Sequence, residues 1–117
     1  MKIYVYPPCS TCKKALKWGQ ANNVHWDVVH IVNEPPTAED ILYWSKENEL
    51  AMRKFFNTSG KKYRELNLKD KLDDMTDQEK AELLASDGML IKRPIVTDGK
   101  KATVGFNEDR FNETWLT

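Results

Sequence analysis

The sequence lacks an excess of charge of either sign. Its 117 residues carry 18 lysines and arginines against 18 aspartates and glutamates, so the formal net charge is zero. A protein that binds nucleic acid or an anionic membrane through its charge needs a basic excess, and this composition supplies none. We therefore expect no direct contact with nucleic acid and no membrane partner.

Long apolar runs are also missing. No stretch approaches the roughly 20 apolar residues that span a bilayer. The opening "MKIYVYPP" is too short for the apolar region of a signal peptide. We therefore expect a cytoplasmic protein.

Cysteine is scarce, and the two that occur, Cys9 and Cys12, are separated by only two residues. In the reducing cytosol such a pair is typical of catalysis or metal binding rather than of a structural disulfide.

The rest of the composition is that of an ordinary globular domain. Hydrophobic residues make up 40% of the chain and charged residues 31%. The length suffices for one domain with a real core but not for two. We see no repeat, low-complexity tract or linker, so we expect a single domain over residues 1–117, and nothing argues against a monomer.

The pattern of apolar and turn residues predicts a mixed α/β order. Strand-like segments alternate with helical ones at first, and a hairpin and a last helix close the chain. A β-α-β unit requires a parallel strand pair, whereas a hairpin adds antiparallel strands. We therefore expect an α/β fold with a small mixed sheet covered by helices. The predicted segments are a strand at 2–6, a helix from 10 to about 22, a strand at 24–32, a helix after 37, a helix at 77–87, a hairpin around 98–99 and a helix after 107.

Several helix ends carry their own signals. Thr37 with Asp40, and Thr76 with Glu79, each have the spacing of a capping box, in which the first side chain and the fourth satisfy each other's backbone N–H groups. Gly88 follows the last apolar residue of the second of these helices, so we expect it to be the C-cap.

A zinc site is the first alternative for the cysteines. His25 and His30 complete the spacing C-x2-C-x12-H-x4-H of a Cys2His2 finger. A finger, however, places its cysteines on a hairpin and its histidines on a helix, and here the cysteines open a helix while the histidines lie in a predicted strand. Residues five apart in a strand point to opposite faces. We therefore expect no metal site, with both histidines as surface or strand-edge polar residues.

The position of the cysteines at a helix start favours thiol chemistry. The thiolate is the nucleophile, and the free N–H groups and dipole of a helix N-terminus stabilise it. Cys9 stands just before the helix and is the predicted attacking thiol, to which Lys13 and Lys14 add a screened positive field. Cys12 lies one turn further on the same side and is the predicted resolving thiol. The alternative is that both are small core residues.

Three longer stretches carry a resemblance to a known family. The segments "KFFNTSGKKYREL", "LLASDGMLIKRPIV" and "VGFNED", together with the C-x-x-C, are similar to the ArsC/Spx/YffB family of arsenate reductases, Spx-type regulators and reductase-like relatives. The resemblance covers essentially the whole chain. It implies a thioredoxin-like fold with a helical insertion at about residues 37–88.

The same resemblance implies a set of site residues. It implies that Pro94 is cis, which would expose the Arg93 backbone to an extended thiol substrate, and that Arg93 lies close to Cys9. An arginine there would stabilise the thiolate or hold an oxyanion; the alternative is a surface arginine in an ion pair. The polar loop of residues 57–60 is implied to lie near the site, and within it Asn57, Ser59 and Gly60 are candidates for substrate binding.

Three functions remain open at this level. Arsenate reductases of the glutathione/glutaredoxin-coupled type gather three arginines around the cysteine, but in this chain Asn57 and Phe106 stand where two of them align, and Arg64 is only a nearby substitute. Cys12 is kept, as in Spx-type regulators, which bind the RNA polymerase α subunit. We therefore expect first a thiol–disulfide oxidoreductase without a bound cofactor, served by glutathione or by a glutaredoxin- or thioredoxin-type reductant. The alternatives are an Spx-type redox regulator and an arsenate reductase.

Overall fold

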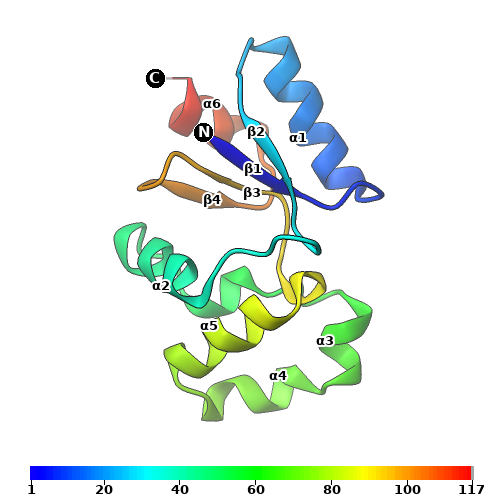
Figure 1. Ribbon diagram of the computed structural model, residues 1–117, viewed down its shortest axis with the longest axis vertical. Coiled ribbons are helices and arrows are strands. Elements are labelled where there is room, and N and C mark those ends of the chain that lie inside the picture. Colours follow the sequence, from blue (N-terminus) through cyan, green and yellow to red (C-terminus); the bar gives the residue numbers. More distant parts are fainter. Residues whose placement is uncertain (117) are drawn as a thin grey trace.

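The computed structural model describes residues 1–116 and shows one four-stranded mixed sheet with helices on both of its faces. The strand order is β2-β1-β3-β4, with β1 and β2 parallel and the other neighbouring pairs antiparallel (Figure 1). The strands are β1 (Lys2–Val5), β2 (Asp27–His30), β3 (Ile95–Thr97) and β4 (Ala102–Val104), and the α-helices are α1 (Ser10–Ala21), α2 (Ala38–Glu47), α3 (Lys61–Glu65), α4 (Leu68–Lys71), α5 (Asp77–Ser86) and α6 (Glu108–Trp115). Three short 3-10 turns, Met52–Phe55, Leu72–Asp74 and Gly88–Leu90, join the helices between β2 and β3.

The predicted mixed sheet is confirmed, with two strands shorter than expected. The strand predicted at 2–6 ends one residue early, at Val5. The segment expected as a strand at 24–32 forms β2 only over Asp27–His30. The reason is the partner: β1 offers four residues, and each pairs with one residue of β2. His25 therefore lies before the strand and is exposed.

The alternation of side chains along β1 separates two apolar cores. Ile3 and Val5 face α1 and α6, where they pack with Trp18 and Phe111. Tyr4 points to the opposite face and joins the larger core under the helices of residues 38–90. Figure 1 shows this as three layers, with α1 and α6 above the sheet and α2 and α5 below it.

The helix caps follow the local sequence closely. The Thr37 and Thr76 hydroxyls each accept a hydrogen bond from the backbone of the fourth box residue, and both capping boxes are complete. The Asn107 side chain caps α6. The prediction for Gly88 is wrong by one residue, because Asp87 is the C-cap of α5. Gly88 is buried instead against Ile31, the residue after β2, and a Cβ atom there would lie 2.1 Å from the Ile31 carbonyl oxygen.

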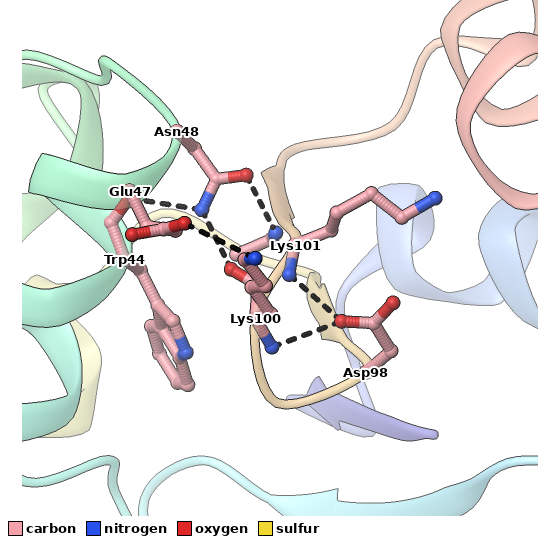
Figure 2. A network of polar contacts seen from close by, with 7 residues as sticks. Trp44, Glu47, Asn48, Asp98, Lys100 and Lys101 are labelled. Carbon is pink, nitrogen blue, oxygen red and sulfur yellow. Dashed lines mark hydrogen bonds and ion pairs between the residues drawn. The ribbon is translucent and has the colours of Figure 1, made fainter.

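Asn48 and an ion pair connect the C-terminus of α2 to the β3–β4 hairpin (Figure 2). The ion pair joins Lys100 Nζ to Glu47 Oε1 at 3.7 Å. The Asn48 Nδ2 donates to the carbonyl oxygens of Trp44 and Lys100, each at 3.0 Å. Its Oδ1 accepts from the backbone N–H of Ala102 at 3.2 Å. Within the predicted hairpin turn, the Asp98 carboxylate accepts from the backbone N–H groups of Lys100 and Lys101. The Asn48 carboxamide thus connects the end of α2 to the start of the edge strand β4.

A short backbone ladder joins the two ends of the segment around residues 55–57 and 90–92, close to where the chain enters β3. Phe56 and Ile91 form an isolated antiparallel bridge. On its two sides, the N–H of Asn57 donates to the Leu90 carbonyl and the N–H of Lys92 donates to the Phe55 carbonyl, both at 2.8 Å. This ladder places the loop after residue 56 beside the segment that leads into β3.

Among the described residues, no helix combines the length and the apolar character that a membrane crossing requires.

Candidate active site

Cys9 stands at the junction of β1 and α1. The prolines at 7 and 8 end the strand, and the N–H of Cys9 donates to the Tyr6 carbonyl at 2.9 Å. Cys9 is the N-cap of α1, and its Sγ accepts the backbone N–H of Cys12 at 3.4 Å. A sulfur therefore occupies the position where helices usually carry a serine or aspartate oxygen, in contact with the free N–H groups of the first turn.

The two thiols lie close together in different environments. Both are free; Cys9 is half-buried and Cys12 is 1% exposed. Burial alone would raise the pKa of Cys9, but the hydrogen bonds from Cys12 and the charge of Arg93 outweigh it and hold the pKa below the ordinary value of 9.0. Burial raises the pKa of the Cys12 thiol to about 12, and the neighbouring Cys9 adds to this rise. The charged form is thus favoured at Cys9 and disfavoured at Cys12.

Arg93 supplies positive charge to both thiols from the chain just before β3. The Arg93–Pro94 peptide bond is cis, as expected. The guanidinium carbon lies 4.9 Å from the centre of the Tyr6 ring, and Nη1 donates to the Ile91 carbonyl at 3.4 Å. The Nε atom is buried, and it has no hydrogen-bond partner among residues 1–116. The guanidinium thus lies against the Tyr6 ring, and its charge favours the thiolate form of Cys9.

A cavity of about 420 Å³ opens at Cys9. Its walls come from the start of α1, the loop after the Phe56 bridge and the chain before β3. The end of β4, the segment after it and the first turn of α6 complete them. The lining residues used below are Cys9, Asn57, Ser59, Lys92, Arg93, Phe106 and Arg110.

The structure brings some of the predicted binding residues to this cavity and leaves others outside its lining. Asn57 and Ser59 line it, whereas Thr58 lines a neighbouring cavity. Gly60 is absent from both linings; it is the N-cap residue of α3, and its N–H donates to the Asn57 carbonyl at 3.0 Å. Pro94 is also outside the linings, and its carbonyl accepts the N–H of Gly105 at 2.8 Å. The substrate contacts of all these residues stay predictions.

The positions of the family's other arginines also lie at the cavity. Asn57 and Phe106, which the resemblance aligns with those arginines, both contribute to the cavity walls. At these two positions the cavity therefore has an amide and a phenyl ring in place of guanidinium groups. Arg64 is exposed on α3 and does not line the cavity. Sequence reasoning missed two cations that do, Lys92 and Arg110. Lys92 stood beside Arg93 in the motif, but no pattern in the sequence indicated Arg110.

The contacts of His30 are with its own loop and with Tyr6, and His25 is exposed before β2. The Nδ1 of His30 accepts the backbone N–H groups of Val32 and Asn33 at 3.2 and 3.3 Å, and its ring contacts Tyr6 edge-on. Within residues 1–116, no three side chains of histidine, cysteine, aspartate or glutamate are grouped as metal ligands would be.

Comparisons with known proteins agree with this geometry. A sequence model of the ArsC family matches residues 4–114. The YusI protein of Bacillus subtilis is 53% identical over 115 residues, which are 98% of each chain. The global transcriptional regulator Spx 1 of Lactococcus lactis is 31% identical over 107 residues, which are 92% of this chain and 82% of the regulator. The crystal structure of a possible arsenate reductase from Streptococcus mutans is 46% identical, with a TM-score of 0.86 over 91% of this chain and 90% of the other.

The family match spans nearly all of the described chain, and the similar crystal structure shares its α/β arrangement. The predicted thioredoxin-like mixed sheet is thereby confirmed, with the two cysteines close together at the start of its first helix. The chain belongs to the ArsC family.

Proposed function

We propose that this protein is a thiol–disulfide oxidoreductase in which Cys9 attacks and Cys12 resolves. The observation that carries the proposal is the contact between the two residues: the Cys12 N–H lies 3.4 Å from the Cys9 sulfur at a helix N-terminus. The pKa values of the two thiols are displaced in opposite directions, down for Cys9 and up for Cys12. One thiol is therefore ready to attack while the other is held protonated until it is needed.

The reaction balances as two exchange steps. The Cys9 thiolate attacks one sulfur of a disulfide substrate, forms a mixed disulfide and releases the other half as a thiolate. Cys12 gives its proton to solvent, its thiolate attacks the Cys9 sulfur, and the second half of the substrate leaves as a thiolate. Two electrons pass from the protein to the substrate, and Cys9 and Cys12 end as a disulfide.

Arg93 supports the charged thiol, and the polar wall beside it holds the substrate. The positive charge of Arg93 stabilises the thiolate of Cys9. Asn57 and Ser59 line the cavity with uncharged polar groups, and the proposal gives Gly60 and Pro94 a place in the same substrate site. A small thiol such as glutathione, or a glutaredoxin- or thioredoxin-type protein, returns the disulfide to two thiols. No prosthetic group takes part.

Intact-mass spectrometry across glutathione redox buffers tests this proposal. Closure of the disulfide removes two hydrogen atoms from the mass of the wild type. The Cys12→Ser variant keeps Cys9 and is expected to accumulate a glutathione adduct, whereas Cys9→Ser is expected to form none. If oxidising buffers produce neither closure nor an adduct, the two thiols are structural and the proposal is wrong.

A second candidate is a redox-sensing regulator. It is favoured by the 31% identity to the Lactococcus lactis protein named global transcriptional regulator Spx 1, since the same cysteine pair would then act as a switch rather than in turnover. The partner would be the RNA polymerase α subunit. A pull-down with the purified α subunit, on reduced and oxidised protein, separates the two candidates: retention in only one redox state supports the regulator, and no retention in either supports the enzyme.

A further inference from the structure

The walls of the Cys9 cavity carry charge of a single sign. Lys92, Arg93 and Arg110 line it, and no aspartate or glutamate among residues 1–116 does so. The whole chain, by contrast, has equal numbers of basic and acidic residues. A cluster of three cations without a carboxylate is therefore a local feature of this cavity, and it favours a ligand that brings negative charge.

The positive lining continues outward from the thiol. A second cavity of about 390 Å³ shares Lys92 and Arg110 with the first, and it adds Arg53 and Lys54. Its lining, too, contains no acidic side chain. Arg53 pairs with Asp73 at 2.7 Å. Lys92 and Arg110 thus line both cavities, and the first of these also contains Cys9.

Among residues 1–116, neither of these two cations, Lys92 and Arg110, takes part in an ion pair. Both are nevertheless held in place by their backbones. The N–H of Lys92 bonds to the Phe55 carbonyl at 2.8 Å, and the N–H of Arg110 bonds to the Asn107 side chain at 3.0 Å.

The glycine at 105 makes room for the lysine. Its φ of 83° lies in the left-handed region, and a Cβ atom there would lie 3.1 Å from Cε of Lys92. The stem of Lys92 therefore passes close to the Gly105 backbone, where a side chain would crowd it.

The guanidinium of Arg93 adds a third positive charge to the same lining. The other polar lining residues, Thr11, Asn57, Ser59 and Asn107, are uncharged, so the described lining has a net positive charge. A ligand that completes this site must bring acceptor atoms and negative charge, and a carboxylate brings both.

We propose that Lys92 and Arg110 form a subsite for the carboxylate of a low-molecular-weight disulfide whose sulfur reacts at Cys9. The proposal rests on the thiol–disulfide exchange proposed above and names the substrate class of that site. The ligand is a disulfide of an amino-acid- or peptide-type thiol, in which a short chain separates the sulfur from a carboxylate. Lys92 and Arg110 are specificity-determining residues, and the exchange itself remains with Cys9 and Cys12.

Two disulfides of similar size and different charge test the subsite. 3,3′-Dithiodipropionate carries two carboxylates, and bis(2-hydroxyethyl) disulfide carries none. The reduced wild type is mixed with each, quenched with acid at set times, and assayed by intact mass for the mixed disulfide and the Cys9–Cys12 disulfide. The wild type is expected to react faster with the dicarboxylate, and this preference is expected to fall as the ionic strength rises.

Charge-removing variants then locate the preference. Lys92→Gln and Arg110→Gln are each expected to slow the reaction with the dicarboxylate by about ten-fold, since a charge-assisted hydrogen bond is lost, while the rate with the neutral disulfide stays within about two-fold. Arg110→Lys keeps a positive charge and is expected to recover most of the preference. Lys69→Gln is the matched control, because Lys69 is an exposed lysine on α4 outside both cavities, and it is expected to behave as the wild type.

The outcomes distinguish this proposal from the one on which it rests. If the wild type reacts equally fast with both disulfides, or if the variants slow both reactions equally, the carboxylate subsite is wrong while the exchange reaction stands. If the wild type reacts with neither disulfide, the exchange reaction is wrong and the subsite falls with it. Thermal unfolding of each variant confirms that the rates compare folded proteins.

Discussion

Replacement of Asn48 by alanine should destabilise the protein through contacts far apart in the sequence. Asn48 is the C-cap of α2, and its Nδ2 bonds to the carbonyl four residues earlier. It also makes two bonds to the β3–β4 hairpin, to the carbonyl of Lys100 and from the N–H of Ala102 (Figure 2). Asn22 is a matched control. It is the C-cap of α1 and also bonds to the carbonyl four residues earlier, at 2.8 Å. Within residues 1–116 its side chain makes no hydrogen bond to another element.

The difference between the two variants isolates the two long-range bonds. A hydrogen bond contributes about 1 kcal/mol net, so Asn48→Ala should lose about 2 kcal/mol more than Asn22→Ala. For a chain of this size the unfolding entropy corresponds to a further drop in Tm of about 8 °C. Urea unfolding gives the free energies, and an unchanged m-value shows that the two folded states expose the same surface.

Two results would refute this reasoning. If both asparagine variants lose the same free energy, the bonds to the hairpin contribute nothing beyond the helix cap. If Asn48→Ala stays within about 0.5 kcal/mol of the wild type, the bridge from α2 to the edge strand is energetically neutral.

Two further predictions concern packing and pH. Gly88→Ala should lower the free energy of unfolding in urea by about 3 kcal/mol, because the added Cβ would lie 2.1 Å from the Ile31 carbonyl oxygen and the backbone must move. A loss under about 1 kcal/mol would show that the backbones at residues 31 and 88 separate at little cost. In iodoacetamide alkylation, Cys12→Ser protein should react through Cys9 with a midpoint below the ordinary thiol pKa of 9.0, and the rate should fall as the pH drops through that lowered pKa. Cys9→Ser protein should react much more slowly at pH 9, because burial, the largest cause of the raised pKa of Cys12, remains when Cys9 is removed. Similar profiles for the two variants would contradict the assigned roles.

The local parts of the fold were predictable from the sequence because their causes are local. The capping residues Thr37 and Thr76 act within one turn of a helix, and both behave as predicted. The placement of Cys9 at the helix start is local in the same way, so the environment of its thiol followed from the chain order. The cis bond before Pro94 came from the resemblance alone, since most bonds before proline are trans.

The failures all depend on contacts between distant segments. Strand β2 ends where its partner β1 runs out, although apolar residues continue past it to Ile31, which is buried outside the strand. Gly88 is set by its close approach to that same residue, which no helix rule encodes. Lys92 and Arg110 line one cavity only because the hairpin between them folds back. The sequence around either residue therefore gives no sign of the other.

The backbone ladder around Phe56 and Ile91 has a consequence for the entropy of binding. Asn57 and Lys92, on opposite sides of this bridge, each donate a backbone N–H across it. The separation of the two cavity walls is therefore set by main-chain hydrogen bonds rather than by flexible side chains. A ligand that enters finds its walls already at their final spacing, so little ordering remains for binding to impose. Selectivity at Cys9 then depends on which side chains the cavity walls carry. Substitutions of these side chains can change the substrate while the backbone of the walls stays the same.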